Sequence, residues 1–162
     1  MKKTVGDIIK VVKEHPGSVL IHGCNCFHTM QAGVAKEVKR AFPEAYQADL
    51  DTKYGDPFKL GDYSSVDTRN GTTVINAYTQ FDLGNGIQVD YGAMRKVFKK
   101  IKEEFGDRKI FYPKIGSGLG GGDWIIIKGI IDQELEGCDH TLVVWEFDPE
   151  TFEVMDMKSP RK

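Results

Sequence analysis

The sequence predicts an α/β protein in which a mixed central sheet lies between two layers of helices, a three-layer α/β/α sandwich. Two observations carry this prediction. Segments with strand character alternate with segments of helical periodicity along nearly the whole chain. The segment at residues 18–24 is almost entirely apolar, which is typical of a strand that is buried on both faces. Strands and helices that alternate at this spacing fold into layered α/β domains.

The first three elements follow this alternation. A short strand is predicted over residues 2–8 and a helix over residues 8–15, where apolar residues recur at helical spacing. Pro16 and Gly17 end that helix, because neither residue continues a helix well. The apolar strand at 18–24 comes next and is expected near the centre of the sheet.

Two helices are predicted after the apolar strand. Small residues lead into the first, which carries Val34, Val38 and Phe42 on one stripe. Pro43 stops that helix or starts the next one, which is predicted over residues 43–55.

A hairpin and a long helix occupy the middle of the chain. Strands are predicted over residues 60–68 and 72–79, and the turn Arg69-Asn70-Gly71 between them is a strong hairpin signal. The helix is predicted over residues 90–106, with apolar residues at helical spacing and a glycine at its end.

The last predicted elements are a strand at 109–115, a helix at 123–137 and a strand at 140–147. Residues 148–162 become polar and basic, and we expect them to fray. No repeat or linker interrupts the chain, so residues 1–162 are expected to form a single domain.

Composition excludes several classes of protein. The chain of 162 residues carries a net charge of -2, so it has no basic excess for tracking a nucleic-acid backbone. Its apolar runs are too short to cross a bilayer. Three cysteines and no secretory leader indicate reduced thiols and a cytoplasmic location.

A glycine-rich segment, PKIGSGLGGGDW at residues 113–124, is the first candidate site. Gly116, Gly118 and Gly121 satisfy G-x-G-x-x-G between a predicted strand and helix, which is one requirement of a dinucleotide-binding turn. The match lies too late in the chain for a nicotinamide-binding half-domain, and a flexible connection is the other alternative. Ser117 lacks the setting of a nucleophile elbow, so we expect it to donate to a phosphate.

The end of the apolar strand is the second candidate site. His22 is either a core histidine or an acid or base at the carboxyl end of a central strand. Asn25 either forms a turn or contacts a sugar hydroxyl. Cys24 and Cys26 do not have the spacing of a structural zinc site, so buried thiols are expected and no metal.

Taken together, the segments VGDI, IHGCNCFHTMQAGVAKEVKRAFPEAY, VINAYTQ and PKIGSGLGGGDW resemble the macro domain, a family of ADP-ribose-binding α/β/α proteins. They are most similar to the branch that contains ADP-ribose 1''-phosphate phosphatases and related deADP-ribosylating enzymes. The four blocks run in family order over about 120 residues. The resemblance implies ADP-ribose or ADP-ribose 1''-phosphate as the ligand, no cofactor and a monomer.

The resemblance also assigns binding residues. Asp7 would accept from the adenine amino group while Ile8 lies against the ring, and Asn25 would contact the distal ribose near Gly33 and Val34. The second loop would wrap the diphosphate through the backbone N–H groups of Ile115, Gly116, Ser117, Gly118, Leu119, Gly120 and Gly121. Trp145 and Phe147 are candidates for stacking on adenine, and each is equally a candidate for the core.

Departures from the family pattern narrow the activity. Gln80 stands where the lysine-dependent deADP-ribosylating members carry their lysine, and Gly120 stands where they carry an aspartate. The pattern that remains is that of the phosphatase, in which His22 matches a functional histidine. Asp123 is either the N-cap of the helix that follows or the acidic partner in catalysis. Hydrolysis of ADP-ribose 1''-phosphate is therefore the expected function. One alternative is a non-catalytic ADP-ribose reader; the other is removal of ADP-ribose from a macromolecule by activated water, with Asn25 and Asp123 as the catalytic polar pair.

Overall fold

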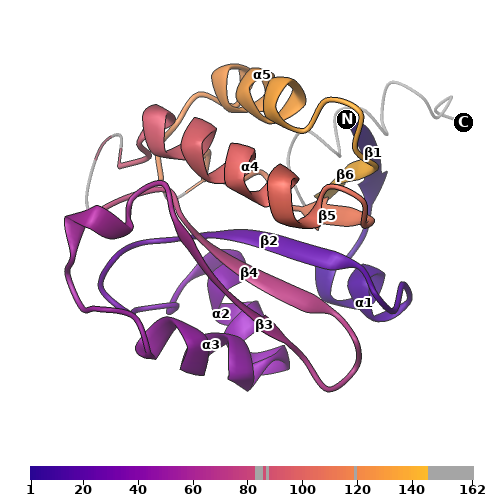
Figure 1. Ribbon diagram of the computed structural model, residues 1–162, viewed down its shortest axis with the longest axis horizontal. Coiled ribbons are helices and arrows are strands. Elements are labelled where there is room, and N and C mark those ends of the chain that lie inside the picture. The colour runs from indigo at the N-terminus through magenta and orange to yellow at the C-terminus, as the bar shows by residue number, and fades with distance from the viewer. Residues whose placement is uncertain (83–85, 87, 119, 146–162) are drawn as a thin grey trace, which may run out of the picture.

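The computed structural model describes residues 1–82, 86, 88–118 and 120–145 (Figure 1). In these residues a mixed sheet has the strand order β1-β6-β5-β2-β4-β3, and only β3 runs antiparallel to its neighbour. The strands are β1 (Lys2–Val5), β2 (Val19–Cys24), β3 (Tyr63–Asp67), β4 (Thr73–Tyr78), β5 (Ile110–Tyr112) and β6 (His140–Val144). The predicted mixed sheet and the predicted β3–β4 hairpin are confirmed.

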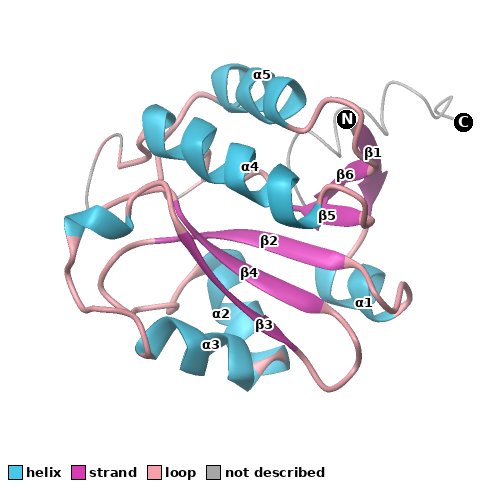
Figure 2. Cartoon of the chain, viewed as in Figure 1, coloured by secondary structure: helices cyan, strands magenta, loops and turns pink. Residues whose placement is uncertain are grey.

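Helices cover both faces of the sheet, as Figure 2 shows. The helices are α1 (Ile8–Lys13), α2 (Gly33–Ala41), α3 (Pro43–Leu50), the 3₁₀ helix η1 (Pro57–Lys59), α4 (Tyr91–Phe105) and α5 (Trp124–Glu134). α4 and α5 pack on one face of the sheet, and α1, α2 and α3 pack on the other. The three-layer α/β/α sandwich is therefore confirmed.

Side chains of the central strands alternate between the two layers because successive residues of a strand point to opposite faces. On β2, Val19 and Ile21 join the core beneath α4 and α5, whereas Leu20 and Cys24 join the core beneath α1, α2 and α3. His22 lies between Leu20 and Cys24 in this alternation, so it belongs to the face that α2 and α3 cover.

Most elements are shorter than the sequence predicts, and for β1 and β5 the structure shows a local cause. β1 ends at Val5 because the Asp7 side chain accepts from Ile9 N and begins α1. β5 ends at Tyr112, directly before a proline that has no N–H to donate to a ladder. α3 ends at Leu50, five residues before the predicted end.

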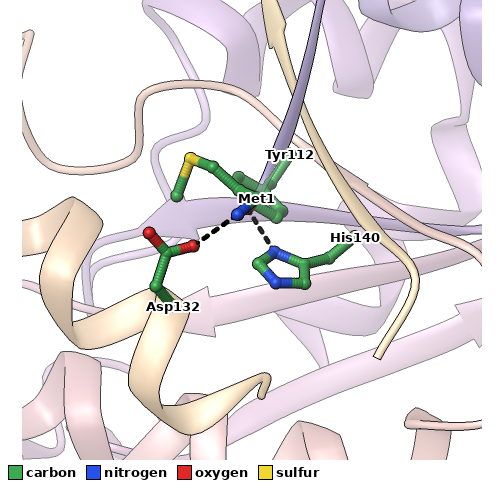
Figure 3. Close-up of polar contacts among 4 residues, drawn as sticks. All are labelled: Met1, Tyr112, Asp132 and His140. Atoms are coloured by element: carbon green, nitrogen blue, oxygen red, sulfur yellow. Dashed lines mark hydrogen bonds and ion pairs between the residues drawn. The ribbon is translucent and has the colours of Figure 1, made fainter. Parts of the chain in front are cut away.

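Two polar contacts link residues on the half of the sheet formed by β1, β5 and β6 (Figure 3). The Met1 amino group lies 2.8 Å from a carboxylate oxygen of Asp132 on α5. The Tyr112 hydroxyl lies 2.6 Å from Nδ1 of His140, and both side chains are buried. Burial raises the pKa of Tyr112 and lowers the pKa of His140, so both groups are neutral near pH 7.

None of the helices in the described part of the chain has the length and hydrophobicity that crossing a membrane requires.

Candidate functional site

A cavity of about 290 Å³ opens at the carboxyl ends of β2 and β5. This is the edge of an α/β sheet at which ligands generally bind. Its volume is near the lower end of the roughly 300–1,000 Å³ that small-molecule sites occupy. Its lining comes from the end of β2, the loop and first turn of α2, one residue of α3, Gln80 and the loop after β5. The two segments that the sequence singles out therefore face each other across one cavity.

The first wall is the loop that leads into α2. His28, Met30 and Gly33 have positive φ angles of 58°, 37° and 59°. Such angles are uncommon for residues other than glycine, and surrounding contacts must hold them in place. Met30 is buried and Tyr46 donates a hydrogen bond to the His28 carbonyl, which supplies such contacts.

The first turn of α2 lines the cavity without a side-chain cap. The first N–H groups of any α-helix lack partners within the helix. Asp7, Asp90 and Asp123 cap α1, α4 and α5, but the N-cap of α2 is Ala32, which makes no such bond. Gly33, Val34 and Ala35 all line the cavity, so the positive end of the α2 dipole faces it.

The second wall is the glycine-rich loop after β5, and its glycines serve two purposes. A Cβ on Gly116, whose φ is 76°, would lie 2.7 Å from Val89 Cγ2. A Cβ on Gly120 or Gly122 would lie 2.7 or 2.8 Å from the Gly116 carbonyl oxygen. Gly118 meets nothing within 4 Å. Close packing therefore requires glycine at 116, 120 and 122, whereas Gly118 borders open space.

Some N–H groups of this loop are used internally and others are not. Gly121 N donates to Gly118 O and Gly122 N donates to Gly116 O. The N–H groups of Gly116, Gly118 and Gly120 make no hydrogen bond to any residue that the structure describes. Those three glycines line the cavity. The loop therefore offers backbone donors to a ligand.

His22 lies at the end of the cavity near the sheet and is 1% exposed. Its Nε2 lies 2.6 Å from Oδ1 of Asn76, its neighbour on β4. Burial lowers the pKa of His22 to about 4, against a smaller opposing effect of the Asn76 hydrogen bond. Burial also raises the pKa of the Cys24 thiol, whose sulfur lies 3.8 Å from both ring nitrogens of His22. The histidine and the thiol are both neutral at pH 7.

Asp49 is a cavity residue that the sequence does not single out. It lies on α3, is 1% exposed and accepts a 2.7 Å hydrogen bond from the Tyr78 hydroxyl. Its other carboxylate oxygen, Oδ2, is buried without a hydrogen-bond partner among the described residues. The Lys59 ammonium lies 5.0 Å from the centre of the Tyr78 ring and donates to Thr52 Oγ1. A buried carboxylate and a buried ammonium thus lie near one end of the cavity.

Asn25 forms a turn and also lies in the cavity lining. Its Oδ1 accepts from Phe27 N at 2.8 Å, which is a turn interaction, and its Nδ2 donates to Thr29 Oγ1 at 2.7 Å. The residue is 7% exposed and lines the cavity. An amide carries two donor hydrogens, so one remains for a ligand.

Gln80 also lines the cavity, where its Nε2 donates to Asp82 O at 2.9 Å. The Cys26 thiol donates to the Gln80 carbonyl at 3.7 Å, so this cysteine has a structural contact. In the described residues no group of three or more His, Cys, Asp or Glu side chains could hold a metal ion.

Several predicted site residues lie outside the cavity. Asp123 is exposed and its carboxylate caps α5 through Ile125 N. Ser117 directs both its N–H and its hydroxyl to the Lys114 carbonyl, so neither donor points to a ligand in this conformation. Ile115 is buried and does line the cavity. Leu119 and Phe147 lie outside the described residues.

The residues predicted to bind adenine lie at the same sheet edge but beside the cavity. Asp7 and Ile8 follow β1, and Trp145 follows β6, the parallel neighbour of β1. Gly6 N donates to Val144 O at 2.9 Å, which keeps the two strand ends together. Asp7 is exposed, Ile8 is buried and Trp145 is 61% exposed.

Two curated proteins are similar to the chain over most of its length. An uncharacterized 17.5 kDa protein of enterobacteria phage T4, from the tk-vs intergenic region, is 39% identical over an alignment of 155 residues, and the alignment covers 90% of this chain and 97% of the phage protein. A DNA ADP-ribosyl glycohydrolase of Thermus aquaticus is 27% identical over 84% of this chain, but the chain spans only 39% of that protein. No family model matches the chain.

Solved macrodomain structures share the fold. The macrodomain of Mycobacterium tuberculosis DarG aligns with a TM-score of 0.69 and 20% identity over 89% of this chain and 95% of that one. The macrodomain of Thermus aquaticus DarG aligns with a TM-score of 0.68 and 23% identity over 90% and 97% of the two chains. Thermosipho africanus DarTG in complex with ADP-ribose aligns with a TM-score of 0.70 and 17% identity, over 90% of this chain and 41% of that one. The chain therefore belongs to the family of the phage T4 17.5 kDa protein and has the macrodomain fold.

Proposed function

We propose that the cavity binds ADP-ribose, with the diphosphate between the first turn of α2 and the loop of residues 116–120. The observation that carries this proposal is that two sets of backbone N–H groups face one cavity and have no hydrogen-bond partner among the residues that the structure describes. A helix N-terminus and a glycine loop of this kind are suited to phosphate oxygens, because the donors point outward and the helix dipole is positive there. ADP-ribose occupies the DarTG structure of the same fold, which supports this choice of ligand.

The two ends of the ligand follow from this placement. The distal ribose is proposed to lie toward Asn25 and His22, which line the cavity beyond the two walls. The adenine is proposed to leave the cavity along the sheet edge toward Asp7 and Trp145. The modest cavity volume of about 290 Å³ suits the diphosphate and the distal ribose, with the base outside.

We propose further that the chain hydrolyses ADP-ribose 1''-phosphate to ADP-ribose and inorganic phosphate. Water attacks phosphorus as the bond between phosphorus and the anomeric oxygen breaks, and that oxygen leaves with the ribose. His22 takes the proton released by the water, and the anomeric oxygen takes a proton from solvent as it leaves. Its pKa of about 4 makes the free ring a weak base, but the negative charge of a bound substrate raises that pKa. Gln80 and Gly120 at the cavity favour this reaction over lysine-dependent cleavage.

The test is release of inorganic phosphate from ADP-ribose 1''-phosphate by the purified chain. His22→Asn should lower kcat at least 10-fold. The control variant is His15→Asn, which should leave kcat unchanged because His15 follows α1 and does not line the cavity. ADP-ribose binding measured by calorimetry should survive in both variants. Equal turnover by His22→Asn and the parent would remove His22 from the mechanism, and no turnover by the parent would remove the phosphatase proposal. Gel filtration of the purified chain tests the proposal that it is a monomer.

A second candidate is removal of ADP-ribose from DNA, which is favoured by the similarity to the Thermus aquaticus glycohydrolase. Parallel assays with ADP-ribosylated DNA and ADP-ribosylated protein separate this candidate from the phosphatase. Tight ADP-ribose binding with no turnover of any of the three substrates would identify a non-catalytic reader.

A further inference from the structure

We propose that Asn76 is a positioning residue that fixes His22 as the Nε2–H tautomer, so that Nδ1 is a hydrogen-bond acceptor at the cavity. Asn76 is completely buried on β4, beside His22 on β2, and does not line the cavity. It can therefore act on a ligand only through His22. The part of this inference that concerns turnover rests on the proposed function; the tautomer itself does not.

The orientation of the Asn76 amide follows from its neighbours. One amide edge lies 2.9 Å from the Ala45 carbonyl oxygen, which can only accept, so Nδ2 must be on that side. Oδ1 then faces His22 at 2.6 Å. Because an amide oxygen can only accept, Nε2 of His22 must carry the hydrogen. A neutral imidazole has one N–H, so Nδ1 keeps its lone pair.

A chain of hydrogen bonds supports the same orientation from the other side. Asn76 Nδ2 also donates to Ser64 Oγ at 3.0 Å, and Ser64 Oγ lies 2.8 Å from the Tyr78 hydroxyl. The Tyr78 hydroxyl donates to the Asp49 carboxylate at 2.7 Å, so its oxygen is left to accept from Ser64. Each hydroxyl has a single hydrogen, and every donor in this chain therefore points from His22 toward Asp49.

The charged groups near His22 do not change this result. Asp49 is the last acceptor in this series of hydrogen bonds. The Lys59 ammonium donates to Thr52, which is not part of the series. The Cys24 thiol is neutral at pH 7 and is itself a weak donor, which an acceptor at Nδ1 can receive. Burial of the ring keeps His22 uncharged, so only one tautomer has to be selected.

An acceptor at Nδ1 limits what His22 can contact. A phosphate oxygen is also an acceptor, so a phosphate cannot hydrogen-bond to this ring and must be held by the N–H groups of the two walls. A water molecule or a ribose hydroxyl can donate to Nδ1. His22 is thus specified as a group that orients and deprotonates water, and not as a donor to the phosphoryl oxygens.

The tautomer can be measured directly by two-dimensional NMR, which correlates the ring carbon-bound hydrogens of ¹⁵N-labelled histidine with both ring nitrogens. At pH 7 the parent protein should show His22 with a protonated Nε2 and an unprotonated Nδ1. A protonated Nδ1 in the parent would overturn the inference without any variant, whether or not the protein is active.

Two variants in the same cluster separate positioning from simple packing. Asn76→Ala removes the acceptor and should populate both tautomers of His22, with at least a 10-fold loss of kcat and less than a 3-fold change in ADP-ribose affinity. Ser64→Ala removes a partner of Asn76 but leaves the Ala45 contact, so the Nε2–H tautomer should persist. An Asn76→Ala protein that keeps the parent tautomer, or a Ser64→Ala protein that loses it, contradicts the inference. If the tautomer is as stated but the parent releases no phosphate, the proposed function fails and this inference stands.

Discussion

Replacement of Gly116 by alanine tests whether the glycine loop is a packed structure or a loose connection. Gly116 has a φ of 76°, and an added Cβ would lie 2.7 Å from Val89 Cγ2 and 3.2 Å from Ile127 Cδ1. A non-glycine residue in the left-handed region costs about 1–2 kcal/mol. Overpacking of a buried contact adds about 1–3 kcal/mol. The two effects together predict a loss of about 2–5 kcal/mol.

Gly118→Ala is the matched control in the same loop. Its φ lies outside the left-handed region and an added Cβ meets nothing within 4 Å. We therefore expect the free energy of unfolding to change by less than about 0.5 kcal/mol, or to rise slightly because alanine restricts the unfolded chain.

Urea unfolding followed by tryptophan fluorescence measures both free energies. In a chain of this size, each kcal/mol lowers the melting temperature by about 2–4 °C, so Gly116→Ala should melt roughly 4–20 °C lower. Equal unfolding midpoints for the two variants would refute the packing account of the loop. Calorimetry then adds a functional result: Gly118→Ala should bind ADP-ribose at least 10-fold more weakly despite its unchanged stability, because its methyl group enters the proposed diphosphate site.

Three further outcomes follow from buried and capping groups. The pKa of His22 is about 4 in the folded protein and about 6.5 in the unfolded chain, so the unfolded state binds more protons between these two values. The free energy of unfolding should therefore fall as the pH drops through this window, by up to roughly 3 kcal/mol. Urea unfolding at pH 7 and pH 4.5 measures this change, and His22→Asn should remove the contribution of His22 to it. Tyr112→Phe should lower the free energy of unfolding by about 1–2 kcal/mol, because it leaves Nδ1 of buried His140 without its hydroxyl partner. In the same assay the control Tyr63→Phe, at an exposed contact, should change that free energy by less than about 0.5 kcal/mol. Asp123→Asn should leave the melting temperature unchanged because asparagine also caps helices, and it should leave the rate of phosphate release unchanged because the side chain lies outside the cavity. A 10-fold loss of rate at an unchanged melting temperature would show that Asp123 takes part in the reaction.

Local signals in the sequence predict most of the fold. The Arg69-Asn70-Gly71 turn identifies the hairpin because its chemistry is contained in three residues, and Gly71 has the positive φ of 86° that such a turn requires. The apolar run at 18–24 identifies a central strand, since a strand covered on both faces buries successive residues, and in β2 every residue except the half-buried Gly23 is buried. Element ends are less accurate, because caps such as Asp7 are decided by individual hydrogen bonds.

The floor of the site depends on contacts between distant segments, which the sequence does not reveal. Asp49 has no distinguishing pattern on α3, and it reaches the cavity only because that helix packs against β3 and β4. Asn76 is one polar residue in an apolar strand, which was a usable signal, but its partner could not be identified before β2 and β4 were aligned in register. Ser117 shows the opposite case, because a nearby carbonyl takes the hydroxyl that the loop pattern offered to a ligand.

The glycine pattern itself was ambiguous for a physical reason. Gly116, Gly120 and Gly122 are required by contacts inside the protein, and the first and last of them also pack against Val89. A loop folded this tightly directs several carbonyl groups inward to its own N–H groups, and the N–H groups that remain at Gly116, Gly118 and Gly120 border the cavity. Packing and the proposed ligand recognition are thus consequences of the same backbone path, so a pattern of glycines alone cannot distinguish them. It also follows that an anion site can exist in a chain with a net charge of -2, because its positive potential comes from backbone dipoles and does not require an excess of lysine and arginine.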